Sequence, residues 1–120
     1  MKKPKQGDII MLDLDPVKGH EQSGHRPALV VSNADFNGAS NLTWVCPITN
    51  TDRKKPMDIR LEGAQTTGYI LCEHIRAVDL TNRGYTVTGD TIGEEVLFRV
   101  TDIVQGAVDV LRSTEVVSSN

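Results

Sequence analysis

The sequence has few aromatic residues and no long apolar run. One Trp, two Tyr and two Phe are present among the 120 residues, which is too little aromatic surface for a module that binds peptides in an aromatic-lined groove. No apolar stretch approaches the ~18 residues that a membrane-spanning helix needs. Acidic residues interrupt the segment IIMLDLD near the N-terminus, which is atypical of a signal peptide. We therefore expect a cytoplasmic protein without membrane contact.

Cysteine is also scarce. Cys46 and Cys72 are the only cysteines, and no CxxC pair is present. This usage is typical of free thiols in a reducing compartment rather than of a disulfide framework or a structural zinc site. Two of the three histidines, His20 and His25, lie five positions apart, a poor spacing for joint metal ligation on a helix. We therefore expect neither a metal nor another cofactor.

The length and charge of the chain set further bounds. At about 150 residues per domain, 120 residues correspond to one domain, and we predict a single domain over residues 1–113 with a frayed tail at 114–120. The net charge is -3, but its distribution is uneven. Residues 1–60 hold nine Lys/Arg and seven Asp/Glu, whereas residues 61–120 hold four and nine. A weakly basic face on the N-terminal half is compatible with a nucleic-acid partner.

Short extended segments separated by turn-rich loops dominate the first two-thirds of the chain. Apolar runs, β-branched residues and period-two alternation indicate strands. The strand candidates are residues 7–14, 28–32, 42–49, 57–61 and 69–80, and residues 33–41 form a turn-rich connection. Pro47 suggests that the third of these strands ends or bulges at a sheet edge.

The last third of the chain has a different period. From Val96 to Leu111 the apolar residues recur at the i, i+3, i+4, i+7 spacing of an amphipathic helix. Thr91 or Asp90 can cap this helix, and Glu94, three residues after Thr91, completes a capping box. Together the patterns predict a mainly β fold of the α+β class, in which a small, mostly antiparallel β barrel is closed by a C-terminal amphipathic helix.

The segment GHEQSGHRP, from Gly19 to Pro27, holds the densest set of chemically active side chains. Two imidazoles, a carboxylate, an amide, a hydroxyl and a guanidinium fall between two glycines and a proline. Surface loops are polar in most proteins, so the composition alone also fits a solvated loop. Arg26 favours a function, because it precedes a strand that would hold it in place and its planar guanidinium matches the geometry of a phosphate.

Three segments of the chain resemble one protein family. The stretch GDIIMLDLDPVKGHEQSGHRPALVVSN (residues 7–33) is similar to the N-terminal signature of the MazF/PemK family of toxin endoribonucleases, and VCPIT (45–49) and TTGYILCEHIRAVD (66–79) match two further family segments. The resemblance covers roughly residues 7–112. It implies a homodimer with an SH3-like barrel that cleaves single-stranded RNA at short motifs without metal. It also implies a small antitoxin whose acidic, extended tail covers the RNA groove.

The resemblance assigns roles to particular residues. Arg26 and Thr49 match the catalytic arginine and threonine of the family. Glu21 and Gln22 match loop residues that handle the substrate or support that arginine. His20 matches a histidine proposed to transfer a proton in the plasmid-borne subgroup.

Three positions depart from the family pattern. Leu71 stands where the plasmid-borne subgroup has an arginine, and Glu73 falls on its partner carboxylate as a conservative change. His74 replaces the usual glutamine. The full acid–base set of that subgroup therefore does not carry over to this chain.

These residues fit RNA cleavage by the substrate's own 2′-hydroxyl, which attacks the adjacent phosphorus and leaves a 2′,3′-cyclic phosphate and a 5′-hydroxyl. The transition state gathers negative charge on the nonbridging oxygens, and prearranged donors stabilise it. We assign Arg26 to this role because its high pKa makes it a poor general acid, and Thr49 adds a hydroxyl donor. The general base is left open between His20, whose ordinary pKa is suitable, and Glu21.

Other residues can contact the RNA backbone. The charge run at 53–55 lies in a polar loop, where it also fits a solvated turn. Arg76 at a strand end can contact RNA or form a surface ion pair with Asp79. The predicted RNA-binding set is Gln22, Arg53, Lys54, Lys55, Glu73 and Arg76.

A second hypothesis keeps the fold and changes the function. Gyrase-inhibiting toxins of the CcdB type share this barrel and act by binding a protein. Such a toxin needs an apolar, aromatic C-terminus, whereas this chain ends in VVSSN. It also has no need for Arg26 together with Thr49, so RNA cleavage is the favoured function.

Overall fold

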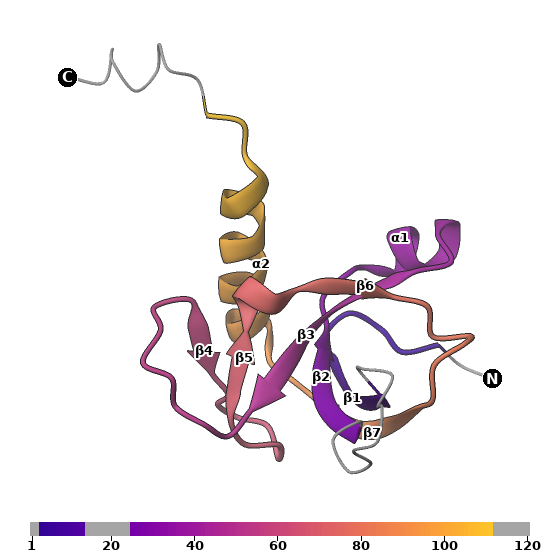
Figure 1. Ribbon diagram of the computed structural model, residues 1–120, viewed down its shortest axis with the longest axis horizontal. Coiled ribbons are helices and arrows are strands. Elements are labelled where there is room, and N and C mark those ends of the chain that lie inside the picture. The colour runs from indigo at the N-terminus through magenta and orange to yellow at the C-terminus, as the bar shows by residue number, and fades with distance from the viewer. Residues whose placement is uncertain (1–2, 14–24, 112–120) are drawn as a thin grey trace, which may run out of the picture.

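An antiparallel sheet and one long helix make up most of the chain. The computed structural model describes residues 3–13 and 25–111. Its strands (Figure 1) are β1 (Asp8–Asp13), β2 (His25–Val30), β3 (Thr43–Thr49), β4 (Asp58–Arg60), β5 (Tyr69–Leu71), β6 (Arg76–Val78) and β7 (Tyr85–Thr91). Its helices are α1 (Ala34–Ala39), the 3-10 turn η2 (Cys72–His74) and α2 (Glu94–Val108). The predicted fold class, mainly antiparallel β with a C-terminal amphipathic helix, is confirmed.

The strands form one sheet in the order β4-β5-β3-β2-β1-β7, and β6 pairs with β3. Every recorded pairing is antiparallel. The first part of β3 pairs with β6, and its end pairs with β5. Among the described residues the end strands β4 and β7 do not pair with each other. The predicted barrel is therefore an open sheet rather than a closed one.

Both faces of the sheet are buried against apolar side chains. On one face, here called the helix face, Ile9 and Leu29 belong to a cluster that includes Val96 and Val100 of α2. The other face, here called the second face, carries a separate cluster made of Ile10, Leu12, Ala28, Val30, Val45 and Val78. Successive strand residues point to opposite faces, so the central strands β1, β2 and β3 contribute to both clusters. The sheet is thereby a rigid support for the side chains at its strand ends.

Helix α2 differs from its predicted boundaries. Its N-cap is Gly93, and no side chain caps it. Thr91 instead pairs with β1 as the last residue of β7, so the predicted capping box with Glu94 does not form. The carboxylate of Asp90 accepts two backbone N–H groups from the connection between β4 and β5. The helix ends at Val108, and its last turns extend past the strands (Figure 1).

The predicted long strand at residues 69–80 is three shorter elements. Strand β5 pairs with the end of β3, η2 turns the chain, and β6 then pairs with the beginning of β3. A single straight strand could not make both pairings, because their registers differ by three residues: Ile48 pairs with Ile70, whereas Val45 pairs with Arg76. Helix α1 was not predicted; Asn33 caps it by accepting the N–H of Phe36. Strand β7 was not predicted either, because Thr and Gly interrupt its apolar alternation.

Pro47 lies inside β3 and does not end it. Across from it on β2 is Ala28. On the other side of β3, Pro47 falls between residues 43–45, which pair with β6, and residues 48–49, which pair with β5. No ladder at that point requires the N–H that proline lacks. The prediction of an end or bulge at Pro47 was therefore wrong.

The two cysteines are free, as predicted, and both are buried. Burial raises the pKa of the Cys46 thiol to about 12, and the nearby Cys72 raises it further. Burial also raises the pKa of Cys72 to about 11, with a further contribution from the charge of Asp58. Both thiols belong to the cluster on the helix face. They are apolar core residues in the folded protein rather than nucleophiles.

The raised thiol pKa values predict a loss of stability at alkaline pH. Above pH 9 the unfolded chain loses its thiol protons first, because its cysteines titrate near the ordinary value of 9.0. The free energy of unfolding should then fall with pH by up to about 1.4 kcal/mol per pH unit for each thiol. Urea unfolding at pH 8, 9.5 and 10.5 measures this. A Cys46→Ala/Cys72→Ala double variant should show a shallower fall, and an equal fall would contradict the prediction.

Candidate active site

Arg26 and Thr49 occupy the ends of neighbouring strands. Arg26 is the second residue of β2 and is exposed, and Thr49 is the last residue of β3 and is half-buried. The recorded pairing of these strands reaches Ala28 opposite Pro47. Continued by two residues, this antiparallel register sets Arg26 opposite Thr49, with both side chains on the second face. The two residues predicted to be catalytic therefore lie at the ends of two central strands, on one face of the sheet.

The surroundings of Thr49 fix its backbone. Gly68 has a φ of +127°, and a Cβ added to it would lie 2.6 Å from the carbonyl oxygen of Thr49. Only glycine allows this close approach. The Oγ1 of Thr49 accepts the N–H of Thr51 at 3.2 Å. Its hydroxyl proton is therefore available to donate to a ligand.

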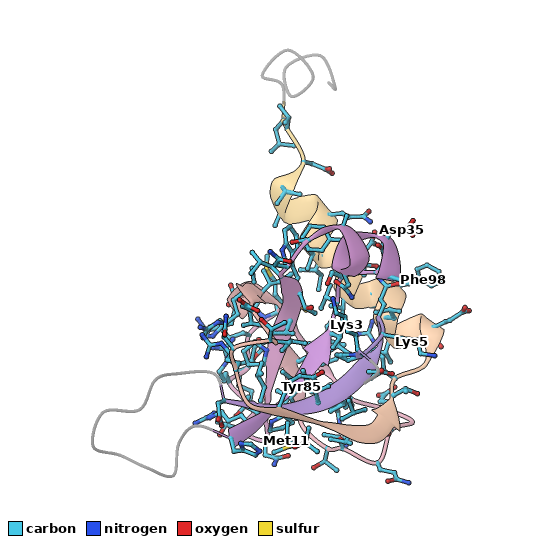
Figure 2. All side chains as sticks on the ribbon, turned by 90° about the vertical axis from the view of Figure 1, so that its right-hand side faces the viewer. Lys3, Lys5, Met11, Asp35, Tyr85 and Phe98 are labelled. Carbon is cyan, nitrogen blue, oxygen red and sulfur yellow. The ribbon has the colours of Figure 1, made fainter. Side chains whose placement is uncertain are left out.

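Arg26 lies at the rim of the second-face cluster. Its partner across the strands is Leu12 of β1, which is fully buried. Leu12 in turn lies opposite Tyr85 of β7, a residue that packs on the same cluster and is labelled in Figure 2. The backbone of Arg26 is thus held in the middle of the sheet while its side chain faces solvent.

Asp13 and His25 close the end of the β1–β2 hairpin. They are cross-strand partners, and His25 Nδ1 lies 2.7 Å from Asp13 Oδ1. Arg83 donates to the carbonyl oxygen of Asp13 at 2.7 Å. The pair joins the last residue of β1 to the first residue of β2. The sequence did not indicate this pair, because the partners are far apart in the chain and their register is not visible in either segment.

The predicted residues His20, Glu21 and Gln22 lie outside the described residues. The predicted tail at 114–120 also lies outside them.

Arg53 organises a network of charged side chains. Its Nε and Nη2 donate to the two carboxylate oxygens of Asp58 at 2.8 and 2.7 Å, and the Asp58 side chain is only 4% exposed. Glu73 lies 3.6 Å from Arg53 Nη2. The two hydrogen bonds from Arg53 to Asp58 raise the pKa of the Arg53 guanidinium. Sequence reasoning missed this partner of Arg53, because a charge in period-two alternation is typical of an exposed strand face.

His74 belongs to the same network. Its Nε2 lies 3.3 Å from Nη1 of Arg53. A guanidinium can only donate, so the ring nitrogen is the acceptor in this contact. The structure therefore brings Arg53, Glu73 and His74 together, and their contacts attach the loop after β3 to the turn η2.

Lys54 and Lys55 are exposed in this loop. Lys54 has a φ of 58°, and its backbone N–H donates to Asp52 at 3.0 Å. The Lys54 side chain is 83% exposed, and its Nζ lies 3.5 Å from the Asp52 carboxylate. Arg76 is half-buried on β6, opposite Val45. Lys54 and Lys55 thus lie in the loop that follows Thr49, and Arg76 lies on β6.

Within residues 3–13 and 25–111, no group of three or more His, Cys, Asp or Glu side chains is arranged to hold a metal ion. No helix in these ranges is long and apolar enough to span a membrane.

Comparison with known proteins identifies relatives of the whole fold. The family described as "PemK-like, MazF-like toxin of type II toxin-antitoxin system" matches residues 5–107. The Endoribonuclease PemK of Escherichia coli is 37% identical over 108 residues, which cover 83% of this chain and 81% of the relative.

Two solved structures from Deinococcus radiodurans are similar to this one. The crystal structure of MazF superimposes with a TM-score of 0.74 at 31% identity and covers 88% of this chain and 96% of that chain. The crystal structure of MazE-MazF (Form-II) gives a TM-score of 0.71 at 29% identity and covers 88% and 95%. Since the family match spans most of the sequence, the fold and the relatives agree: the chain belongs to the PemK-like, MazF-like toxins of type II toxin–antitoxin systems.

Proposed function

We propose that the chain is a toxin endoribonuclease that cleaves single-stranded RNA at short sequence motifs without a metal ion. The 2′-hydroxyl of the substrate attacks the adjacent phosphorus and leaves a 2′,3′-cyclic phosphate and a 5′-hydroxyl. The observation that carries this proposal is the position of Arg26 and Thr49 on one face, at the ends of adjacent strands. The endoribonuclease PemK, a relative by sequence, supports the same class of reaction.

Arg26 and Thr49 supply donors to the reacting phosphate. The exposed guanidinium of Arg26 offers two parallel charged hydrogen bonds to nonbridging oxygens. The Thr49 hydroxyl, which already accepts from Thr51, donates its own proton to the same group. The sheet holds both residues before substrate arrives, so little reorganisation is needed in the transition state.

The remaining roles follow the predicted set. His20 or Glu21 removes the 2′-hydroxyl proton, and Gln22 contacts the RNA. Lys54, Lys55 and Arg76 attract the RNA backbone. We also propose that Arg53 and Glu73 contact the RNA. Their contacts with each other and with Asp58 would in addition position the loop after β3.

Mapping both ends of the fragments from one long defined RNA tests the proposed reaction. Cleavage at a recurring motif, with a cyclic phosphate on one fragment and a 5′-hydroxyl on the next, is the expected result. Fragments with 5′-phosphates would contradict the mechanism, and intact RNA would contradict the function. No finding described above supports the gyrase-inhibiting alternative, which predicts intact RNA.

We also propose that two copies of the chain form a homodimer through an apolar groove beside α2. Trp44 of β3, Met57 and the α2 residues Ile103, Val104 and Val108 line this groove. Trp44 is 40% exposed, and Val108 is 72% exposed. An exposed apolar surface of this kind, continued by Val110 and Leu111, favours burial against a second copy.

The charged variant Val108→Glu is expected to convert the dimer to a monomer. Val108 is exposed in the single chain, so the variant should fold, whereas a buried carboxylate at the interface would be strongly unfavourable. Sedimentation equilibrium measures the change, which should weaken association by tenfold or more, on the order of 1.4 kcal/mol. Phe98→Glu is the matched control, since Phe98 projects from α2 outside the groove (Figure 2). A monomeric parent protein would contradict the proposal.

The partner implied by the family is an antitoxin, and the Deinococcus MazE-MazF complex supports such a pairing. We propose that an acidic, extended antitoxin segment binds over the Arg26 region and competes with RNA there. A disordered anionic segment can imitate the charge of RNA and orders on binding. An antitoxin complex that cleaves RNA at the full rate would contradict a shared groove.

The proposed location is the cytoplasm, where the RNA substrates are.

A further inference from the structure

A row of polar and aromatic side chains continues from Arg26 and Thr49 to the far strand of the sheet. Thr49 lies opposite Tyr69 of β5, and Tyr69 lies opposite Arg60 of β4. Directly opposed residues of antiparallel strands share a face, so all four side chains lie on the second face. At about 4.8 Å per strand, the row from Arg26 to Arg60 spans about 14 Å along the sheet.

The guanidinium groups of Arg60 and Arg53 differ in their contacts. Arg53 is bound by the carboxylate of Asp58, with Glu73 close by. Arg60 is exposed at the end strand of the sheet. Among residues 3–13 and 25–111, no hydrogen bond or ion pair engages its guanidinium. Arg60 therefore keeps its full charge and its bidentate geometry for a ligand.

Tyr69 stands between this charge and the active-site residues. The ring is half-buried, and it lies between Thr49 and Arg60 in the row. Pairing with β3 on one side and β4 on the other holds the strand that carries the ring. An aromatic ring between two arginines matches the surfaces that bind single-stranded nucleic acid, where bases stack on aromatic rings and cations follow the phosphates.

We propose that Arg60 binds a second phosphate of the single-stranded RNA, a few nucleotides away from the phosphate held by Arg26, with a base resting on Tyr69 between them. This inference rests on the proposed function and extends it. It defines the path of the RNA over the sheet, which runs across β2, β3, β5 and β4. Arg60 then contributes to substrate binding and not to the chemical step.

The test uses an oligoribonucleotide that contains the mapped cleavage motif, with one 2′-deoxy sugar at the scissile position to prevent cleavage. Arg60→Ala should bind it about three- to tenfold more weakly near 0.15 M salt, because one phosphate contact is lost. The slope of log binding constant against log salt should become shallower by about 0.7. Arg60→Lys should retain the slope. On the cleavable RNA, Arg60→Ala should raise KM and leave kcat unchanged.

Arg99→Ala is the matched control. Arg99 is an exposed arginine on α2, so the substitution removes the same charge away from the row. It should leave both the affinity and the salt slope at the parent values. An equal loss in the two variants would mean that Arg60 acts only through net charge, and would overturn the proposal. A thermal unfolding midpoint equal to that of the parent protein would show that the Arg60→Ala variant is folded.

Shortening the oligonucleotide locates the contact. Nucleotides are removed from one end and then, in a separate series, from the other. The penalty of Arg60→Ala should vanish in only one series, once the RNA is too short to reach β4. A penalty that persists in both series, or an Arg60→Ala variant with parent affinity and slope, would overturn the proposal while the protein still cleaves RNA. Failure of the parent protein to cleave RNA would instead contradict the proposed function.

Discussion

Replacing Arg26 by alanine is expected to reduce RNA cleavage by about 10²–10³-fold, the loss that follows removal of one prearranged donor to a transition-state oxyanion. The fold should not change, because the Arg26 side chain is exposed while its backbone pairs with Leu12 of β1. Single-turnover cleavage of a defined RNA measures the effect. An unchanged thermal unfolding temperature shows that the loss is not structural.

Arg26→Lys is the informative comparison for this residue. Lysine retains the charge but loses the two parallel hydrogen bonds of the guanidinium. We expect its activity to lie much closer to that of the alanine variant than to the parent. Full activity in Arg26→Lys would show that a point charge suffices, and the proposed bidentate contact would be wrong.

A single 2′-deoxy sugar immediately 5′ of the scissile phosphate is expected to stop cleavage at that position. The substitution removes the nucleophile itself, so no arrangement of protein donors can compensate. Binding should be nearly unchanged, because phosphate contacts supply most of the affinity for nucleic acid. Gel analysis of a radiolabelled RNA measures cleavage, and fluorescence anisotropy measures binding.

The same substitution one nucleotide further along the RNA provides the control and should leave cleavage intact. EDTA should leave the rate unchanged, since Arg26 provides the charge stabilisation that a metal ion would otherwise provide. Cleavage at the deoxy site would exclude attack by the 2′-hydroxyl. Complete inhibition by EDTA would exclude a reaction without metal.

The sequence predicted what depends on local pattern. The apolar alternation of β1 and the helical period of α2 were visible in short windows, and the family resemblance located Arg26 and Thr49. The opposition of Arg26 and Thr49 depends on the β2–β3 register, which neither strand encodes alone. The same holds for Asp13 with His25.

Other parts of the structure could not be predicted because competing contacts decide them. Thr91 has the chemistry of a helix cap, but the ladder between β1 and β7 uses it first. Pro47 has the chemistry of a strand end, but it falls where no neighbour needs its N–H. Arg53 resembled a free cation in a polar loop until the fold brought Asp58 against it.

The pairing of β1 with β7 has a consequence for how the protein is made. Met11 pairs with Thr86, so the strand next to Arg26 gains its second neighbour only when most of the chain has been synthesised. Contacts between such distant positions slow folding, because a long loop must be ordered before they form. A ribosome that stops early therefore releases a chain whose central sheet is incomplete. The complete sheet, and with it the folded enzyme, can form only after β7 has been synthesised.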